Sequence, residues 1–158
     1  MTTRTDHATD DERPFPLVPV LEPVWDGLSR LSYPLVRVAT GAMLIPHGYA
    51  KLFGGGLEPT AAFMASAGLQ PAYPLAVYIA CVEFIGGILL VLGLLTRPVA
   101  VLVAGFMFVA AFHVHWPNGF LWVKGGFEYP LMWGLLALAL VFGGSGRYSL
   151  DWLIGREV

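Results

Sequence analysis

The chain has 158 residues, of which 56% are hydrophobic and only 13% are charged. Soluble domains average about 45–50% apolar and about 25% charged residues, so this composition is typical of a protein embedded in lipid. The net charge of -2 is small and the sequence has no long run of basic residues, which argues against a nucleic-acid partner. The single cysteine, Cys81, rules out an internal disulfide, a Cys-x-x-Cys redox pair and a thiolate metal site, and we expect no metal.

The N-terminal segment, residues 1–32, is polar and acidic and differs from the rest of the chain. It carries six of the eleven acidic residues, and it lacks the basic start and apolar core of a signal peptide. We expect it to be largely disordered or to lie at the cytoplasmic membrane surface, and Pro19 and Pro23 argue against a continuous helix there. Residues 33–145 then form a transmembrane domain, and residues 146–158 form a cytoplasmic tail.

Four apolar segments approach the length of about 20 residues that a helix needs to cross a bilayer. They cover residues 34–53, 73–95, 97–116 and 127–142, with turns rich in glycine or proline between them. This pattern predicts an all-α membrane protein built as a bundle of four transmembrane helices. Between the first two spans, residues 57–70 predict a short helix that lies at the membrane interface.

The distribution of basic residues predicts the orientation of these spans. Under the positive-inside rule, the side with more Lys and Arg faces the cytoplasm, and here seven basic residues lie on one side and two on the other. Both termini are therefore predicted to be cytoplasmic. The seven are Arg4, Arg13, Arg30, Arg37, Arg97, Arg147 and Arg156, and the two are Lys51 and Lys124.

Ionisable residues at membrane depth are energetically costly, and by default they mark a functional site. In the first span, Arg37, Thr40, Leu44, His47 and Lys51 are spaced by three and four residues, so they share one stripe of the helix. We expect this stripe to face the interior of the bundle.

Glu83 lies ten residues into the second span, or roughly 15 Å below its outer end. Either His47 or Arg37 is near enough in depth to pair with it. The carboxyl group is then part of a buried structural ion pair, or it is protonated, or it belongs to a working proton or ligand site. These alternatives remain open at the level of sequence.

A second polar cluster lies at the outer end of the third span and in the loop that follows. Two residues turn a helix by about 200°, so His113 and His115 cannot both face one cavity, and we favour His113 as the inward one. We expect His113, Trp116, Asn118 and Lys124 to contact a ligand there.

Six aromatic residues crowd the same outer rim, and they form either an ordinary aromatic belt or a stacking surface for a planar ligand. A quinone fits the second interpretation, with His47, Lys51 and His113 binding its oxygens and Glu83 exchanging its protons. Haem between His47 and His113 is disfavoured, because no further histidine pair or motif supports it. The six aromatic residues are Trp116, Phe120, Trp122, Phe127, Tyr129 and Trp133.

Four stretches of the sequence closely resemble the DoxX family of bacterial membrane proteins. They are RVATGAMLIPHGYAKLFGG, VEFIGGILLVLGLLTRP, FHVHWPNGFLWVKGGFEYPLMWG and GGSGRYSLD, in this order along residues 33–151. The resemblance implies a four-helix bundle in the bacterial inner membrane. It also implies a link to quinone-dependent redox or oxidative-stress chemistry, and it brings no established catalytic residue with it.

Three hypotheses about function follow. The first is a quinone-linked redox subunit with a polar site in the outer half of the bundle, in which Glu83 and His47 are catalytic and Arg37 and Lys51 help to bind the ligand. The second is a non-catalytic scaffold or anchor subunit of a membrane oxidoreductase complex, with a redox partner protein or a second copy bound to it. The third is a small-molecule or proton pathway, which needs a polar route below Glu83, where only Arg37 and Thr40 are evident.

Overall fold

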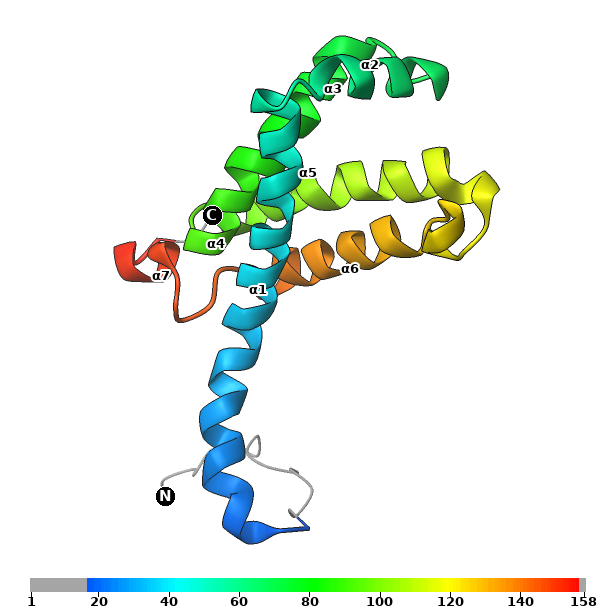
Figure 1. Cartoon of the computed structure of the whole chain (residues 1–158). Helices are drawn as coiled ribbons and strands as arrows, with labels where there is room; N and C mark the ends of the chain where they lie inside the picture. The colour runs from blue at the N-terminus through cyan, green and yellow to red at the C-terminus, as the bar shows by residue number, and fades with distance from the viewer. Residues whose placement is uncertain (1–16, 157–158) are drawn as a thin grey trace, which may run out of the picture.

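The computed structural model describes residues 17–156, and all of the regular elements in this range are helices (Figure 1). Of the N-terminal segment 1–32, which we expect to be disordered or interfacial, residues 1–16 lie outside the described residues. The longer helices are α1 (Glu22–Phe53), α2 (Leu57–Ser66), α3 (Ala72–Cys81), α4 (Gly87–Leu92), α5 (Thr96–Val109), α6 (Glu128–Gly143) and α7 (Leu150–Ile154). Two π-helices, η2 (Val82–Gly86) and η3 (Ala110–His115), and three 3-10 helices, η1 (Pro19–Leu21), η4 (Trp116–Asn118) and η5 (Trp122–Lys124), connect them.

Two continuous helical stretches are long and apolar enough to cross a membrane. Residues 72–92 combine α3, η2 and α4 over 21 residues, and residues 96–118 combine α5, η3 and η4 over 23 residues. The predicted positions of the second and third helices are thereby confirmed. The other two predicted spans correspond to α1 and to α6, which has 16 residues. A bundle that crosses the membrane four times, and an interfacial position for α2, stay predictions.

Helix α1 is longer than the sequence predicted, because it begins at Glu22 and runs without interruption to Phe53. The expected break near Pro23 is wrong: this proline occupies the first turn, where its missing N–H removes no hydrogen bond within the helix. At 1.5 Å per residue, 32 residues span about 48 Å. Residues 22–32 are exposed and extend away from the other helices (Figure 1).

The helices pack in two groups. Helix α1 lies along η2 and α4, with α2 and α3 near its C-terminal end, while α5 and α6 form an antiparallel pair that leaves α1 near its middle (Figure 1). The groups meet through a core of fully or nearly fully buried apolar side chains. The core includes Leu44, Leu90, Val99, Ala100, Val103, Ala137 and Leu140.

A buried arginine holds the segment after α6 against α1. Arg37 is only 2% exposed, and its guanidinium donates hydrogen bonds to the carbonyl oxygens of Ser145 at 2.6 Å and Tyr148 at 2.5 Å. Gly93 at the end of α4 adopts φ +67°, and a Cβ atom at this residue would lie 1.9 Å from Arg37 Nη1. Residue 93 is therefore a glycine for two reasons: it adopts a positive φ, and a side chain would overlap with Arg37.

Asp151 in α7 caps the start of α5 from a distant part of the chain. Its two carboxylate oxygens accept hydrogen bonds from the backbone N–H groups of Leu95 at 2.9 Å and Thr96 at 3.1 Å. Backbone N–H groups at the start of a helix lack partners within the helix, and a carboxylate there also interacts favourably with the helix dipole. Asp151 is 4% exposed, so water does not readily replace it.

We expect Asp151→Ala to lower the free energy of unfolding by about 2–4 kcal/mol, because two buried N–H groups lose a charged acceptor. Thermal unfolding of the purified protein in detergent measures the change. Glu58→Ala is the control, since Glu58 is an exposed carboxylate in α2. Equal unfolding midpoints for the two variants would contradict a stabilising role for the Asp151 cap.

Candidate functional site

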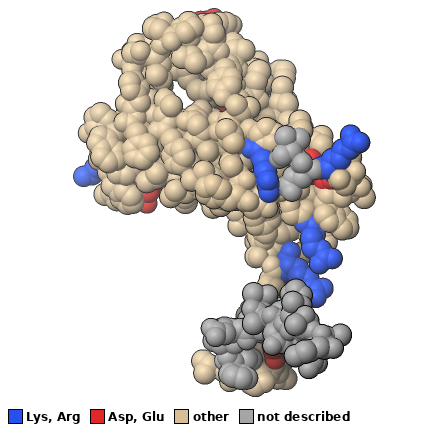
Figure 2. All heavy atoms as spheres, turned by 180° about the vertical axis from the view of Figure 1, so that it is seen from behind, with Lys and Arg blue, Asp and Glu red and all other residues tan. Residues whose placement is uncertain are grey.

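A cavity of about 910 Å³ lies between α1, α2, α3, η2, α5, η3 and α6, and its lining is mostly apolar. Figure 2 shows a hollow in the broad upper part of the molecule, away from the projecting end of α1. Small-molecule sites typically have volumes of roughly 300–1,000 Å³, with apolar walls and a few convergent polar groups. The cavity matches this description, and its polar groups are the candidates for ligand contacts.

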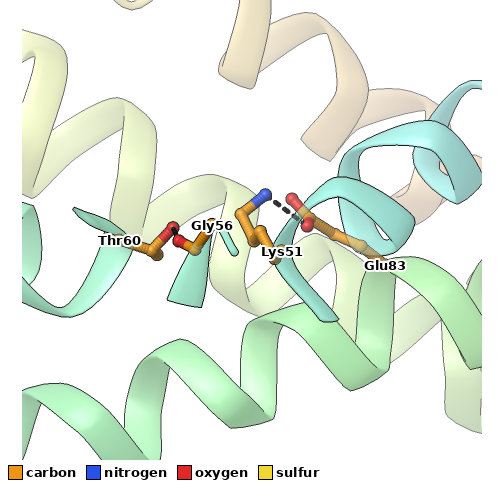
Figure 3. Close-up of polar contacts among 4 residues, drawn as sticks. All are labelled: Lys51, Gly56, Thr60 and Glu83. Atoms are coloured by element: carbon orange, nitrogen blue, oxygen red, sulfur yellow. Dashed lines mark hydrogen bonds and ion pairs between the residues drawn. The ribbon is translucent and has the colours of Figure 1, made fainter. Parts of the chain in front are cut away.

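Several of the polar lining residues come from the ends of helices. Lys51 is near the C-terminus of α1, His115 ends η3, and Tyr129 is the second residue of α6. The α5 and α6 pair leaves α1 near its middle, so Lys51 on one side and His115 and Tyr129 on the other belong to different walls of the cavity (Figure 1). Thr60 of α2 also lines the cavity, with its hydroxyl donating to the Gly56 carbonyl oxygen at 2.7 Å (Figure 3).

An ion pair between Lys51 and Glu83 forms part of the cavity wall. Lys51 Nζ lies 2.5 Å from Glu83 Oε2, and the two side chains are 20% and 8% exposed (Figure 3). Gly48 allows this approach, since a Cβ atom there would lie only 2.3 Å from the backbone nitrogen of Phe84 in η2. Burial makes the pairing important, because a buried charge without a partner is costly.

This pairing corrects the expectation that Glu83 pairs with Arg37 or His47. The guanidinium of Arg37 binds the Ser145 and Tyr148 carbonyls instead, far from the cavity lining. His47 is exposed toward the cavity, one turn before Lys51 on the same face of α1. The predicted stripe on α1 is confirmed as an inward face, with Arg37, Thr40 and Leu44 buried and the remaining two side chains in the cavity wall.

The π-helical turn η3 corrects the expectation that His113 faces inward. His115 lines the cavity and His113 does not. The prediction used α-helical geometry, but the i→i+5 hydrogen bonds of a π-helix widen the turn and change the direction of each side chain. Glu83 also lies in a π-helix, η2, and such turns occur frequently at functional sites.

Hydrogen bonds to backbone carbonyls orient both histidine rings. His115 Nδ1 lies 2.7 Å from the Gly125 carbonyl oxygen, which can only accept, so Nδ1 carries the proton and Nε2 is left for a ligand. His113 Nε2 donates to the Ala67 carbonyl oxygen at 3.0 Å. His113 thus connects η3 to the end of α2.

The predicted aromatic rim divides into two sets. Trp122, Tyr129 and Trp133 line the cavity, with the rings of Trp122 and Tyr129 4.8 Å apart and those of Tyr129 and Trp133 5.9 Å apart. Trp116 stacks on Phe127 at 4.6 Å and is absent from the cavity lining. The first set provides flat surfaces for a planar ligand, and the second is typical of an aromatic belt.

Of the eight predicted site residues, Glu83, His47 and Lys51 lie together in the cavity wall. The other five lie elsewhere: Asn118 Nδ2 donates to the Gly125 carbonyl oxygen at 3.0 Å, and Lys124 and Trp116 are exposed. Sequence reasoning preferred His113 to His115, and it missed Thr60 and Tyr78. Tyr78 precedes Glu83 by five residues. In a regular α-helix this spacing puts two side chains on different faces, whereas the π-helix η2 brings them to the same side.

The helices and the cavity define a helical membrane protein with a partly open, mostly apolar site. A family model described as DoxX matches residues 33–116, and the chain belongs to the DoxX family. No solved structure matches the chain.

Three relatives illustrate the similarity. "Putative oxidoreductase CatD" of Bacillus subtilis (strain 168) is 37% identical over 117 residues, which is 74% of this chain and 82% of the relative. "Inner membrane protein YqjF" of Escherichia coli (strain K12) is 30% identical over 128 residues, which is 78% of this chain and 92% of the relative. An "Uncharacterized protein" of Haemophilus influenzae is 33% identical over 119 residues, or 73% and 85% of the two chains.

A double-mutant cycle tests the energetic coupling of Lys51 and Glu83. We expect Lys51→Met and Glu83→Gln each to destabilise the protein, because each leaves a buried partner unpaired. We expect the double variant to lose less free energy of unfolding than the two single variants lose together, by about 1–3 kcal/mol. Thermal unfolding in detergent measures all three, with Lys124→Met as the control for loss of an exposed lysine. Additive effects would show that the pair is uncoupled.

Proposed function

We propose that this chain is a quinone-binding subunit of a redox system in the bacterial inner membrane, and that the quinone ring occupies the cavity. The observation that carries the proposal is the composition of the cavity wall: flat aromatic surfaces and apolar side chains surround a small number of hydrogen-bonding groups. A quinone ring needs this combination, because its faces are apolar and its two carbonyl oxygens accept hydrogen bonds.

Groups from different helices suit the two quinone oxygens. Lys51 uses one of its N–H groups for Glu83, so further donors remain for a ligand oxygen. On the α5 and α6 side, His115 Nε2 and the Tyr129 hydroxyl are the available groups. Trp122 and Trp133 then provide surfaces against which the ring packs.

The proposed chemistry divides the work between this chain and a partner. Reduction of a quinone to a quinol requires two electrons and two protons, and a partner oxidoreductase supplies the electrons. The residues of this chain bind the two oxygens and deliver one proton to each. His115 supplies the proton for one oxygen, and His47, which takes up its proton through Glu83, supplies the proton for the other; both protons come from water. The name of the Bacillus subtilis relative, an oxidoreductase, supports a redox role.

The proposal includes a four-span topology with cytoplasmic termini. It is supported by the apolar stretches 72–92 and 96–118, by α1, and by α6, whose 16 residues suffice where neighbouring helices cover a thinned edge. Most Lys and Arg side chains visible in Figure 2 gather on one side of the molecule, as the positive-inside rule requires of a cytoplasmic face. The name of the Escherichia coli relative supports an inner-membrane location.

Quenching of tryptophan fluorescence tests the ring site, since quinones quench nearby indoles and the cavity contains Trp122 and Trp133. We expect saturable quenching of the detergent-purified protein by benzoquinones or naphthoquinones. Lys51→Met and His115→Leu should each raise the Kd about tenfold, because each removes one hydrogen bond that involves a charged or polar group.

Lys124→Met is the matched control for the lysine variant, because Lys124 is exposed and outside the cavity lining. It should leave the Kd unchanged. Quenching that never saturates would refute the proposal, and so would equal Kd values for Lys51→Met and Lys124→Met. Unchanged affinity in every cavity variant, together with stable co-purification of an oxidoreductase, would instead favour a scaffold role.

A further inference from the structure

Along α5, the cavity extends well beyond His115. Val101 of α5 lines the cavity and precedes His115 by 14 residues, which corresponds to roughly 21 Å along the helical axis. The wall between these residues is apolar apart from the backbone. The volume of about 910 Å³ is also near the upper end of the range of roughly 300–1,000 Å³ for ligand sites. The site has room for more than a ring.

The apolar end of the cavity is open to the outside. Met43 of α1 and Val101, Leu102 and Val109 of α5 all line the cavity, yet they are 56%, 53%, 43% and 47% exposed. Gly105 lies between them on α5 and is exposed as well, with no atom within 4 Å of the Cβ atom that it lacks. The cavity therefore opens past α1 and α5 along this stripe.

The proposed topology places this opening at the depth of the membrane hydrocarbon. Val101, Gly105 and Val109 lie in the first part and the middle of the 23-residue stretch 96–118. In the proposed topology these residues face lipid chains, since a span of this length crosses the full hydrocarbon core. An apolar opening into hydrocarbon suits a hydrocarbon chain, which passes from the cavity to the lipid without contact with water.

We propose that the ligand of this cavity is a quinone with an isoprenoid chain. The ring of the quinone lies between Lys51 and His115, and its chain passes over Gly105 into the bilayer. This inference rests on the proposed function, because the ring site is the same. It specifies the substrate class as membrane-soluble quinones rather than water-soluble ones. The α5 wall around Gly105 then determines the preference for a chain, and Lys51 and His115 determine the binding of the ring.

The test compares two quinones with the same ring, one without a chain and one with a decyl chain, on the full-length protein in detergent. Fluorescence quenching gives the Kd of each quinone for the wild type and for Gly105→Phe. We expect the phenylalanine to fill the path of the chain and to raise the Kd of the decyl quinone about tenfold or more, while the Kd of the ring-only quinone stays the same. Comparing two proteins with one quinone cancels the partition of that quinone into micelles.

Gly27→Phe is the matched control, because Gly27 is exposed on α1, also lacks neighbours within 4 Å of a Cβ atom, and is outside the cavity lining. It should change neither Kd. Gly105→Leu repeats the test with a smaller side chain if the phenylalanine variant does not fold. An equal effect of Gly105→Phe on both quinones, or no effect on either, would overturn the chain path and leave the ring site standing. Absence of saturable quenching by both quinones in the wild type would overturn the proposed function itself.

Discussion

Buried charged groups need partners, and this constraint connects the parts of the structure. Arg37 and Lys51, on one stripe of α1, each bind a group from another part of the chain. Arg37 binds the carbonyls that follow α6, and Lys51 binds Glu83 of η2. An unpaired charge in an apolar interior costs several kcal/mol, so these contacts strongly favour one arrangement of the helices around α1.

The regions around these two contacts differ in how closely the helices pack. Near Arg37, the guanidinium and the Asp151 cap of α5 pack the helices closely, and the space is filled. Near Lys51, the helices diverge and leave the cavity, with His47, Lys51 and Glu83 on one wall and His115 on another. The polar groups of the cavity wall therefore lie away from the Arg37 side of the molecule.

The candidate site could be predicted in part. The spacing of three and four residues from Arg37 to Lys51 is a local property of one helix, so the inward face of α1 followed from it. The choice between His113 and His115 failed because it assumed a regular α-helix, and η3 is a π-helix. The prediction of the partner of Glu83 was also wrong, because the depth of two residues along separate helices does not determine which side chains meet.

By itself, the sequence determined the positions of the two apolar helical stretches at residues 72–92 and 96–118, since apolar length, glycine and proline act within a few residues of chain. It also determined which face of α1 turns inward and which ionisable residues are buried with it. Tertiary structure decided the Lys51–Glu83 pair, the capping of α5 by Asp151 and the open cavity past Gly105. These features depend on how closely two helices approach and at what angle they diverge, and packing between distant segments sets both.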